Sequence, residues 1–66
     1  MRNNIVFPNL VAAMARNGDN LRTIGKLLNM TAQSVCRKMS GKVEWKRREI
    51  ELICQRYNKS YEELFK

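Results

Sequence analysis

The stretch IGKLLNMTAQSVCRKMSG, residues 24–41, places a glycine inside a helical pattern and an asparagine where that pattern breaks. Ile24 and Leu28 recur at helical spacing around Gly25, although glycine costs a helix about 1 kcal/mol relative to alanine. Asn29 then interrupts the pattern before a second apolar series begins. Because a helical glycine usually has a packing reason, Gly25 is predicted to remove a side chain where two helices approach closely.

Asn29 is suited to the break between the two apolar series. Asparagine is among the few residues other than glycine that tolerate the left-handed backbone of a sharp chain reversal. We therefore predict two short helices over residues 21–28 and 31–39, which cross steeply, with Gly25 and Asn29 shaping the motif. This arrangement is a helix-turn-helix, in which the second helix enters the major groove of DNA.

Start and stop signals place the other helices. Pro8 is suited to the first turn of a helix, and Gly41 to the end of the second helix of the pair. Residues that cap helices stand before three of the other predicted starts, namely Asp19 or Asn20, Thr31, and Ser60 with its capping-box partner Glu63. The predicted helices cover about residues 8–16, 21–28, 31–39 and 46–57, followed by the short turn SYEELF.

The whole chain is predicted to form one all-α domain over residues 1–66, with about five short helices and a flexible arm at residues 1–7. A chain of 66 residues buries only about 60% of its unfolded surface, which leaves little material for an enzyme cleft. With no histidine, two cysteines and one aspartate, the composition excludes zinc clusters and serine–histidine dyads. We therefore expect no catalytic residue, no cofactor, no metal and no small-molecule substrate.

Positive charge is concentrated in the middle of the chain. Thirteen Lys and Arg residues against six Asp and Glu give a net charge of +7. Residues 1–20 sum to +1 and residues 49–66 to −1, so residues 21–48 carry the remaining +7. Such asymmetry is typical of a chain that binds a polyanion, either nucleic acid or a membrane surface. A solvated basic face that serves only solubility is the alternative interpretation.

The two cysteines are too few for a disulfide scaffold. Cys36 and Cys54 each stand at a helical position among apolar neighbours, so both are predicted to be small core residues in a reducing compartment. The start MRNNIVFPN contains only a three-residue apolar run, far less than a signal peptide or a membrane span requires. We therefore expect a cytoplasmic protein that does not act at a membrane.

Several segments together resemble one family. PNL with MARNG, IGKLLNMTAQSVCRKMSGK, EWKRREIELIC and YEELF are similar to the lambda repressor and Cro class, also called the XRE family. Within that class the chain is most similar to the short phage-type repressors of Gram-positive bacteria, and the resemblance runs from Pro8 to Phe65. It implies a lambda repressor-like DNA-binding domain that recognises an operator in double-stranded DNA and represses transcription.

Three positions depart from the pattern of that class. Asn29 stands where glycine is usual, Leu21 where a polar residue such as glutamine is usual, and Lys46 where serine or threonine caps the helix. Lys46 and Arg47 make the helix start basic, which the helix dipole disfavours unless a phosphate lies close. This departure favours a phosphate contact there, although an exposed basic cluster without a function fits nearly as well.

If Val35 and Met39 face the core, the opposite edge of the helix over residues 31–39 is free to meet DNA. The candidates for reading bases, at positions that read bases in the resembled class, are Gln33, Arg37, Ala32 and Ser34. Glutamine pairs with adenine and arginine with guanine through two hydrogen bonds, while alanine packs on the thymine methyl group. The candidates for phosphate contact are Thr31, Arg22, Lys38, Lys42 and Lys46.

Other functions remain open at this point. The same fold serves as a protein-interaction module that binds another regulator, in the manner of an anti-repressor. RNA binding is disfavoured because the aromatic residues are predicted in the core, these being Phe7, Trp45, Tyr57, Tyr61 and Phe65. Trp45 either covers the end of the core or stacks on a DNA sugar. Any homodimer is expected to be weak and to use the last two helices or Phe65.

Overall fold

The computed structural model describes residues 7–66, and these form five helices without a strand. The helices are α1 (Pro8–Arg16), α2 (Leu21–Leu28), α3 (Ala32–Met39), α4 (Arg47–Tyr57) and α5 (Tyr61–Phe65). The predicted all-α fold class is therefore confirmed, and the predicted helix bounds hold to within one residue. The proposed arm falls largely outside the described residues. Phe7 is half-buried and packs against the core, so the extension of the arm to that residue was wrong.

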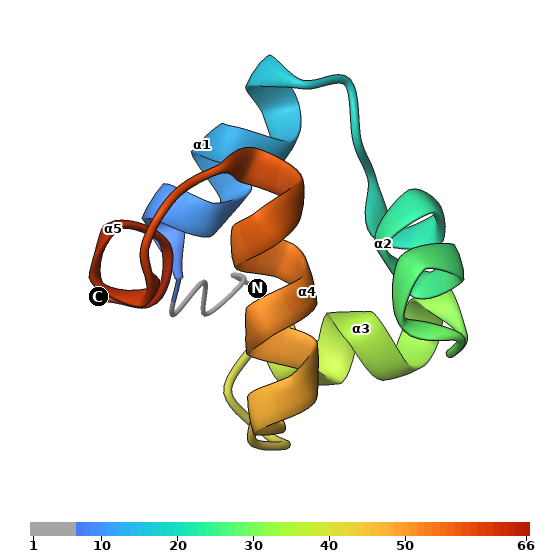
Figure 1. The fold of residues 1–66 in the computed structure, drawn as a ribbon. Coiled ribbons are helices and arrows are strands. Elements are labelled where there is room, and N and C mark those ends of the chain that lie inside the picture. Colours follow the sequence, from blue (N-terminus) through green and yellow to red (C-terminus); the bar gives the residue numbers. More distant parts are fainter. Residues whose placement is uncertain (1–6) are drawn as a thin grey trace.

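The helices are arranged around α4, which lies at the centre of the view in Figure 1. The α2–α3 pair lies to one side of α4, while α1 and α5 lie to the other. Contacts join α2 to both α3 and α4, and α5 to both α1 and α4. The contacts with α4 consequently determine most of the orientation of the α2–α3 pair relative to the other helices.

Each helix contributes one large, fully buried side chain to the core. These are Leu10, Ile24, Val35, Ile53 and Leu64, in the order α1 to α5. Full burial of an aliphatic side chain of this size contributes about 1.5–3 kcal/mol. Ile24 and Val35 come from the predicted helix pair, and all five side chains form one continuous core with their buried neighbours, among them Leu28 and Met39.

Aromatic rings close the end of the core where the described chain begins. The ring of Phe65 lies 5.6 Å from those of both Phe7 and Trp45, in edge-to-face geometry. Trp45 is half-buried and packed against the core, which confirms that it covers the core end. Tyr61 stacks on Phe65 but is 46% exposed, so its predicted core position was wrong. It lies in the first turn of a helix of only five residues, which buries mainly its last two.

Helices α1 to α4 all end in the same way. A residue with a left-handed backbone lies one or two positions beyond the last residue of each helix, and these residues are Gly18, Asn29, Gly41 and Asn58. After α2, the Asn29 N–H donates to the Lys26 carbonyl (3.3 Å) and the Met30 N–H to the Gly25 carbonyl (2.8 Å). This pair of bonds is the Schellman motif. The left-handed conformation predicted for Asn29 is therefore confirmed, with φ of 60°.

Gly25 lies where the chain folds back on itself after α2. A Cβ atom at this position would stand 2.6 Å from the carbonyl oxygen of Met30, too close for any real contact. The predicted close approach is therefore confirmed, but the obstacle is the backbone of the turn rather than a side chain of the facing helix. Because Met30 is also held by its hydrogen bond to Gly25, this carbonyl has little freedom to move away.

Replacing Gly25 with alanine should therefore destabilise the protein. In most helices the change from glycine to alanine stabilises by about 1 kcal/mol. Here we expect Gly25→Ala to lower the melting temperature because the new methyl group displaces the Met30 carbonyl. Thermal unfolding followed by circular dichroism is the measurement, with Lys26→Ala as the exposed neighbouring control. A rise in melting temperature for Gly25→Ala would contradict this account of the turn.

Candidate nucleic-acid interface

One face of α3 is open to solvent. Gln33 and Arg37, one turn apart, are both exposed, while Val35 and Met39 are buried on the other side. Cys36 is also exposed, so its predicted core position was wrong. Successive residues of a helix are rotated by about 100°, so the orientation of α3 that buries Val35 turns Cys36 towards solvent, on the same face as Gln33. The open face is therefore formed by Gln33, Cys36 and Arg37, and the sequence analysis did not include the cysteine in it.

The first turn of α3 is organised by its cap. The hydroxyl of Thr31 accepts the Ser34 N–H (3.1 Å) and lies 3.0 Å from the Ser34 hydroxyl, to which it donates. The capping role predicted for Thr31 is thereby confirmed. Ala32 and Ser34 are half-buried, and they flank the open face rather than forming its centre.

Exposed cations lie on the elements that precede and follow α3 in the chain. Arg22 and Lys26 lie one turn apart on α2, Lys42 and Lys46 lie in the loop after α3, and Arg48 lies in the first turn of α4. Within residues 7–66, no acidic side chain is paired with any of these five groups or with Arg37. Their charges are therefore available to an external anion.

Lys38 does not belong to this set, and its predicted phosphate contact was wrong. Its residue exposure is 6%, and its ammonium Nζ lies 2.5 Å from Oε1 of Glu49, which is equally buried. The same ammonium lies 5.9 Å from the ring centre of Trp45. Lys38 adjoins the buried Met39 and faces α4, so its charge is used inside the molecule.

Glu49 joins the end of α3 to the start of α4. Besides Lys38, its Oε1 accepts the backbone N–H of Lys46 at 3.0 Å, which supplies the helix cap that Lys46 itself lacks. Burial raises the pKa of the Glu49 carboxyl, but the hydrogen bonds from Lys38 and the Lys46 N–H lower it by more. The pKa therefore lies below its ordinary value, and the carboxyl stays charged near neutral pH.

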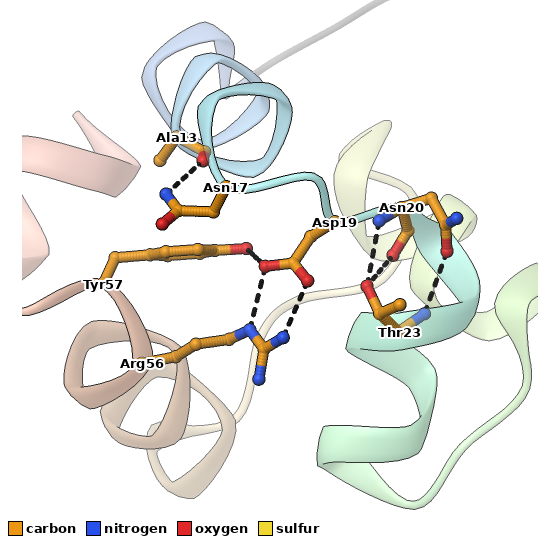
Figure 2. A network of polar contacts seen from close by, with 7 residues as sticks. All are labelled: Ala13, Asn17, Asp19, Asn20, Thr23, Arg56 and Tyr57. Atoms are coloured by element: carbon orange, nitrogen blue, oxygen red, sulfur yellow. Dashed lines mark hydrogen bonds and ion pairs between the residues drawn. The ribbon is translucent and has the colours of Figure 1, made fainter.

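A second carboxylate holds the link before α2 (Figure 2). Asp19, whose side chain is 5% exposed, accepts two hydrogen bonds from Arg56, from Nε at 2.8 Å and Nη2 at 2.7 Å. The Tyr57 hydroxyl donates a third, at 2.6 Å. Asn20 caps α2 by accepting the Thr23 N–H, so Asp19 is not the cap but the tie to the end of α4. Sequence reasoning offered both as caps and missed this network.

A hollow is lined by residues of the loop after α3 and of α4 and α5, with Phe7 before α1. Its volume is about 420 Å³, and it is lined by Phe7, Gly41, Val43, Glu44, Trp45, Ile50, Tyr61 and Phe65. Val43 and Tyr61 are the large apolar side chains exposed on residues 7–66. This hollow carries no cluster of acid, base and nucleophile that would suggest catalysis.

Comparisons with known proteins supply no relative. No protein-family model, curated protein or solved structure matches this chain. Across residues 7–66, every helix falls short of the length and apolar character needed to cross a membrane. In the same part of the chain, no three His, Cys, Asp or Glu side chains gather as metal ligands would. The case for a function therefore rests on the geometry of the α3 face.

The Asp19 network makes stability depend on pH. The hydrogen bonds from Arg56 and Tyr57 hold the pKa of the Asp19 carboxyl well below its usual range. Its contribution is therefore fully present above the unfolded-state pKa of about 3.9, and is lost as the pH falls from there towards the folded-state pKa. We expect Asp19→Asn to cost about 1–3 kcal/mol at pH 7 and much less near pH 2.

Glu62→Gln is the matched control, because Glu62 is exposed and forms no ion pair within residues 7–66. Denaturant unfolding between pH 2 and pH 7 is the measurement. A constant difference in unfolding free energy between wild type and Asp19→Asn across this range would show that the Asp19 charge does not tie the link to α4.

Proposed function

We propose that the protein binds double-stranded DNA with α3 in the major groove and acts as a phage- or prophage-type transcriptional repressor in the cytoplasm. In this proposal it is a member of the lambda repressor and Cro class, and the α2–α3 pair is its helix-turn-helix. One observation carries the proposal. The open face of α3 presents Gln33 and Arg37, and exposed cations that form no ion pair within residues 7–66 lie on α2, which packs against α3, and on the loop leading to α4.

The dimensions of α3 suit the groove. The helix has eight residues and is therefore about 12 Å long, comparable with the width of the major groove. Gln33 and Arg37 are assigned to base edges, with adenine and guanine as their respective partners. Ala32 and Ser34 lie at the margins of the open face, where alanine suits a thymine methyl group and serine suits either a donor or an acceptor.

The surrounding groups are assigned to phosphates. Arg22, Lys42 and Lys46 remain candidates for phosphate contact, as the sequence predicted. Thr31 caps α3, and phosphate contact is its secondary role. Lys26 and Arg48 join them because both are exposed and unpaired within residues 7–66. Such contacts position the protein on the duplex without reading its sequence. Two copies in a weak homodimer would occupy half-sites about 34 Å apart.

A second candidate function is a protein-interaction module that binds another regulator. The hollow beside Val43 and Tyr61 favours it, because it gathers the exposed large apolar side chains of residues 7–66. The cations around α3 favour DNA instead, since a module that binds only through this hollow has no use for them. Salt dependence separates the two functions.

Binding to duplex DNA should weaken steeply with salt. If the five cations around α3 neutralise about five phosphates, the logarithm of the association constant should fall with the logarithm of salt concentration with a slope of roughly −4 to −5. Fluorescence anisotropy with a labelled duplex measures this. Absence of binding, or a slope near zero, would exclude the proposed DNA interface and leave the interaction module.

Arg37 and Lys42 should behave differently when each is replaced with alanine. Arg37→Ala should remove about 1–3 kcal/mol of discrimination at one base position of an operator selected from random DNA, with little change in melting temperature. Lys42→Ala should weaken specific and random duplexes by the same factor. Equal weakening of both duplexes by Arg37→Ala would move Arg37 to the phosphate-contacting residues.

Bound DNA should protect Cys36 from alkylation. Cys36 lies on the open face, whereas Cys54 is half-buried and burial raises the pKa of its thiol. In a Cys54→Ser variant, Cys36 is the single thiol, and its reaction with a maleimide is followed by mass spectrometry. We expect saturating duplex to slow the reaction at least tenfold. An unchanged rate in a demonstrably bound complex would place the interface elsewhere.

A further inference from the structure

We propose that Glu49 is a positioning residue of the DNA interface, which fixes the phosphate-binding loop relative to the base-reading helix. The inference rests on the proposed function and deepens it. The loop is defined here as residues 40–46, which connect α3 to α4 and carry Lys42 and Lys46. Glu49 contacts no DNA in this proposal and acts only through the residues that it holds.

The far end of the loop is held by Glu49. One carboxylate oxygen, Oε1, accepts hydrogen bonds from Lys38 near the end of α3 and from the Lys46 N–H at the end of the loop. Glu49 is 5% exposed, so water does not compete strongly for these bonds. A single buried atom thus sets the separation between α3 and the backbone of Lys46.

The near end of the loop is held by α3 itself. The Arg37 carbonyl accepts the Lys42 N–H at 3.0 Å and the Ser40 hydroxyl at 3.0 Å, and Gly41 supplies the left-handed turn. The acceptor of both bonds is the backbone of Arg37, whose side chain is assigned to a base. Lys42 is therefore placed by the backbone of α3, while Lys46 is placed by Glu49.

Loss of the Glu49 charge would release the end of the loop at Lys46. The buried ammonium of Lys38 would then lack its counterion and would have to reach solvent, which separates α3 from the start of α4. Lys42 would keep its place because its bonds lie within α3 and its cap. Lys46 and the neighbouring Arg48 would lose their fixed distance from Gln33 and Arg37, and with it the ability to meet phosphates while α3 reads bases.

The experiment compares Glu49→Gln with Glu51→Gln. Both variants remove one negative charge from α4, but Glu51 is 61% exposed and makes only a surface pair with Arg47. General electrostatics would strengthen DNA binding in both variants. A positioning role predicts that Glu49→Gln weakens binding to specific and random duplexes alike and makes the salt slope shallower by about one to two, while Glu51→Gln does neither.

Binding is measured well below the melting temperature of each variant, with folding verified by circular dichroism. A purely structural role would lower the melting temperature and the active fraction but leave the salt slope unchanged. If Glu49→Gln does not fold, the double variant Lys38→Met with Glu49→Leu replaces the pair by apolar residues that pack, and, unlike glutamine, leaves no side-chain acceptor for the Lys46 N–H. The same shallower slope is then expected.

An unchanged slope in a folded variant, with affinity equal to that of Glu51→Gln, would overturn the positioning role of Glu49. The steep slope of the wild type would in that case still support the proposed function. Failure of the wild type to bind DNA would overturn both proposals, so the two failures are distinguishable.

Discussion

The close approach of the Met30 carbonyl to Gly25 is the constraint on which the arrangement of this protein depends. It lets α2 end and α3 begin within a three-residue turn, closed by the left-handed Asn29 and the bond from Met30 to Gly25. Any side chain at position 25 would push the turn away. The open face of α3 is therefore presented at one fixed angle to α2, which is what a helix needs if it is to enter a groove while its partner meets the backbone.

Two buried carboxylates then fix this pair against α4. Asp19 ties the link before α2 to Arg56 and Tyr57 at the end of α4, and Glu49 ties α3 to the start of α4. The pair is thus held near both ends of the central helix rather than by apolar contact alone. Ion pairs of this kind are directional, so they restrain orientation where a small core leaves it poorly determined.

Because Glu49 is paired with Lys38 and Asp19 with Arg56, neither carboxylate neutralises the exposed cations of residues 21–48. Of the remaining acids, Glu51 pairs with Arg47 and Glu63 caps α5 through the Ser60 N–H. Within residues 7–66, none of the acidic side chains is paired with Arg37 or with the exposed cations of α2, of the loop after α3 and of the first turn of α4 named above. The excess charge of residues 21–48 is therefore not merely a property of composition. Much of it is exposed on α2, on α3 and on the loop that follows α3, and this exposure is the basis of the proposed function.

The sequence by itself determined what depends on residues within about one helical turn of each other. The helix bounds, the caps at Thr31 and Ser60 and the turn at Asn29 follow from bonds between residues three to five apart, so the local pattern was sufficient. Gln33 and Arg37 were predicted to be exposed for the same reason, because Val35 sets the rotation of α3.

Only the tertiary structure decided which charges are used internally. Lys38 was assigned to phosphate because spacing along α3 does not show what packs beside that helix, whereas the exposure of Cys36 follows from the same rotation of α3 that exposes Gln33. The partner of Lys38 lies 11 residues away, and Asp19 meets Arg56 across 37 residues. Residue type and spacing do not reveal such pairs, since they form only when packing around α4 brings distant segments together and removes the water that would otherwise solvate each charge.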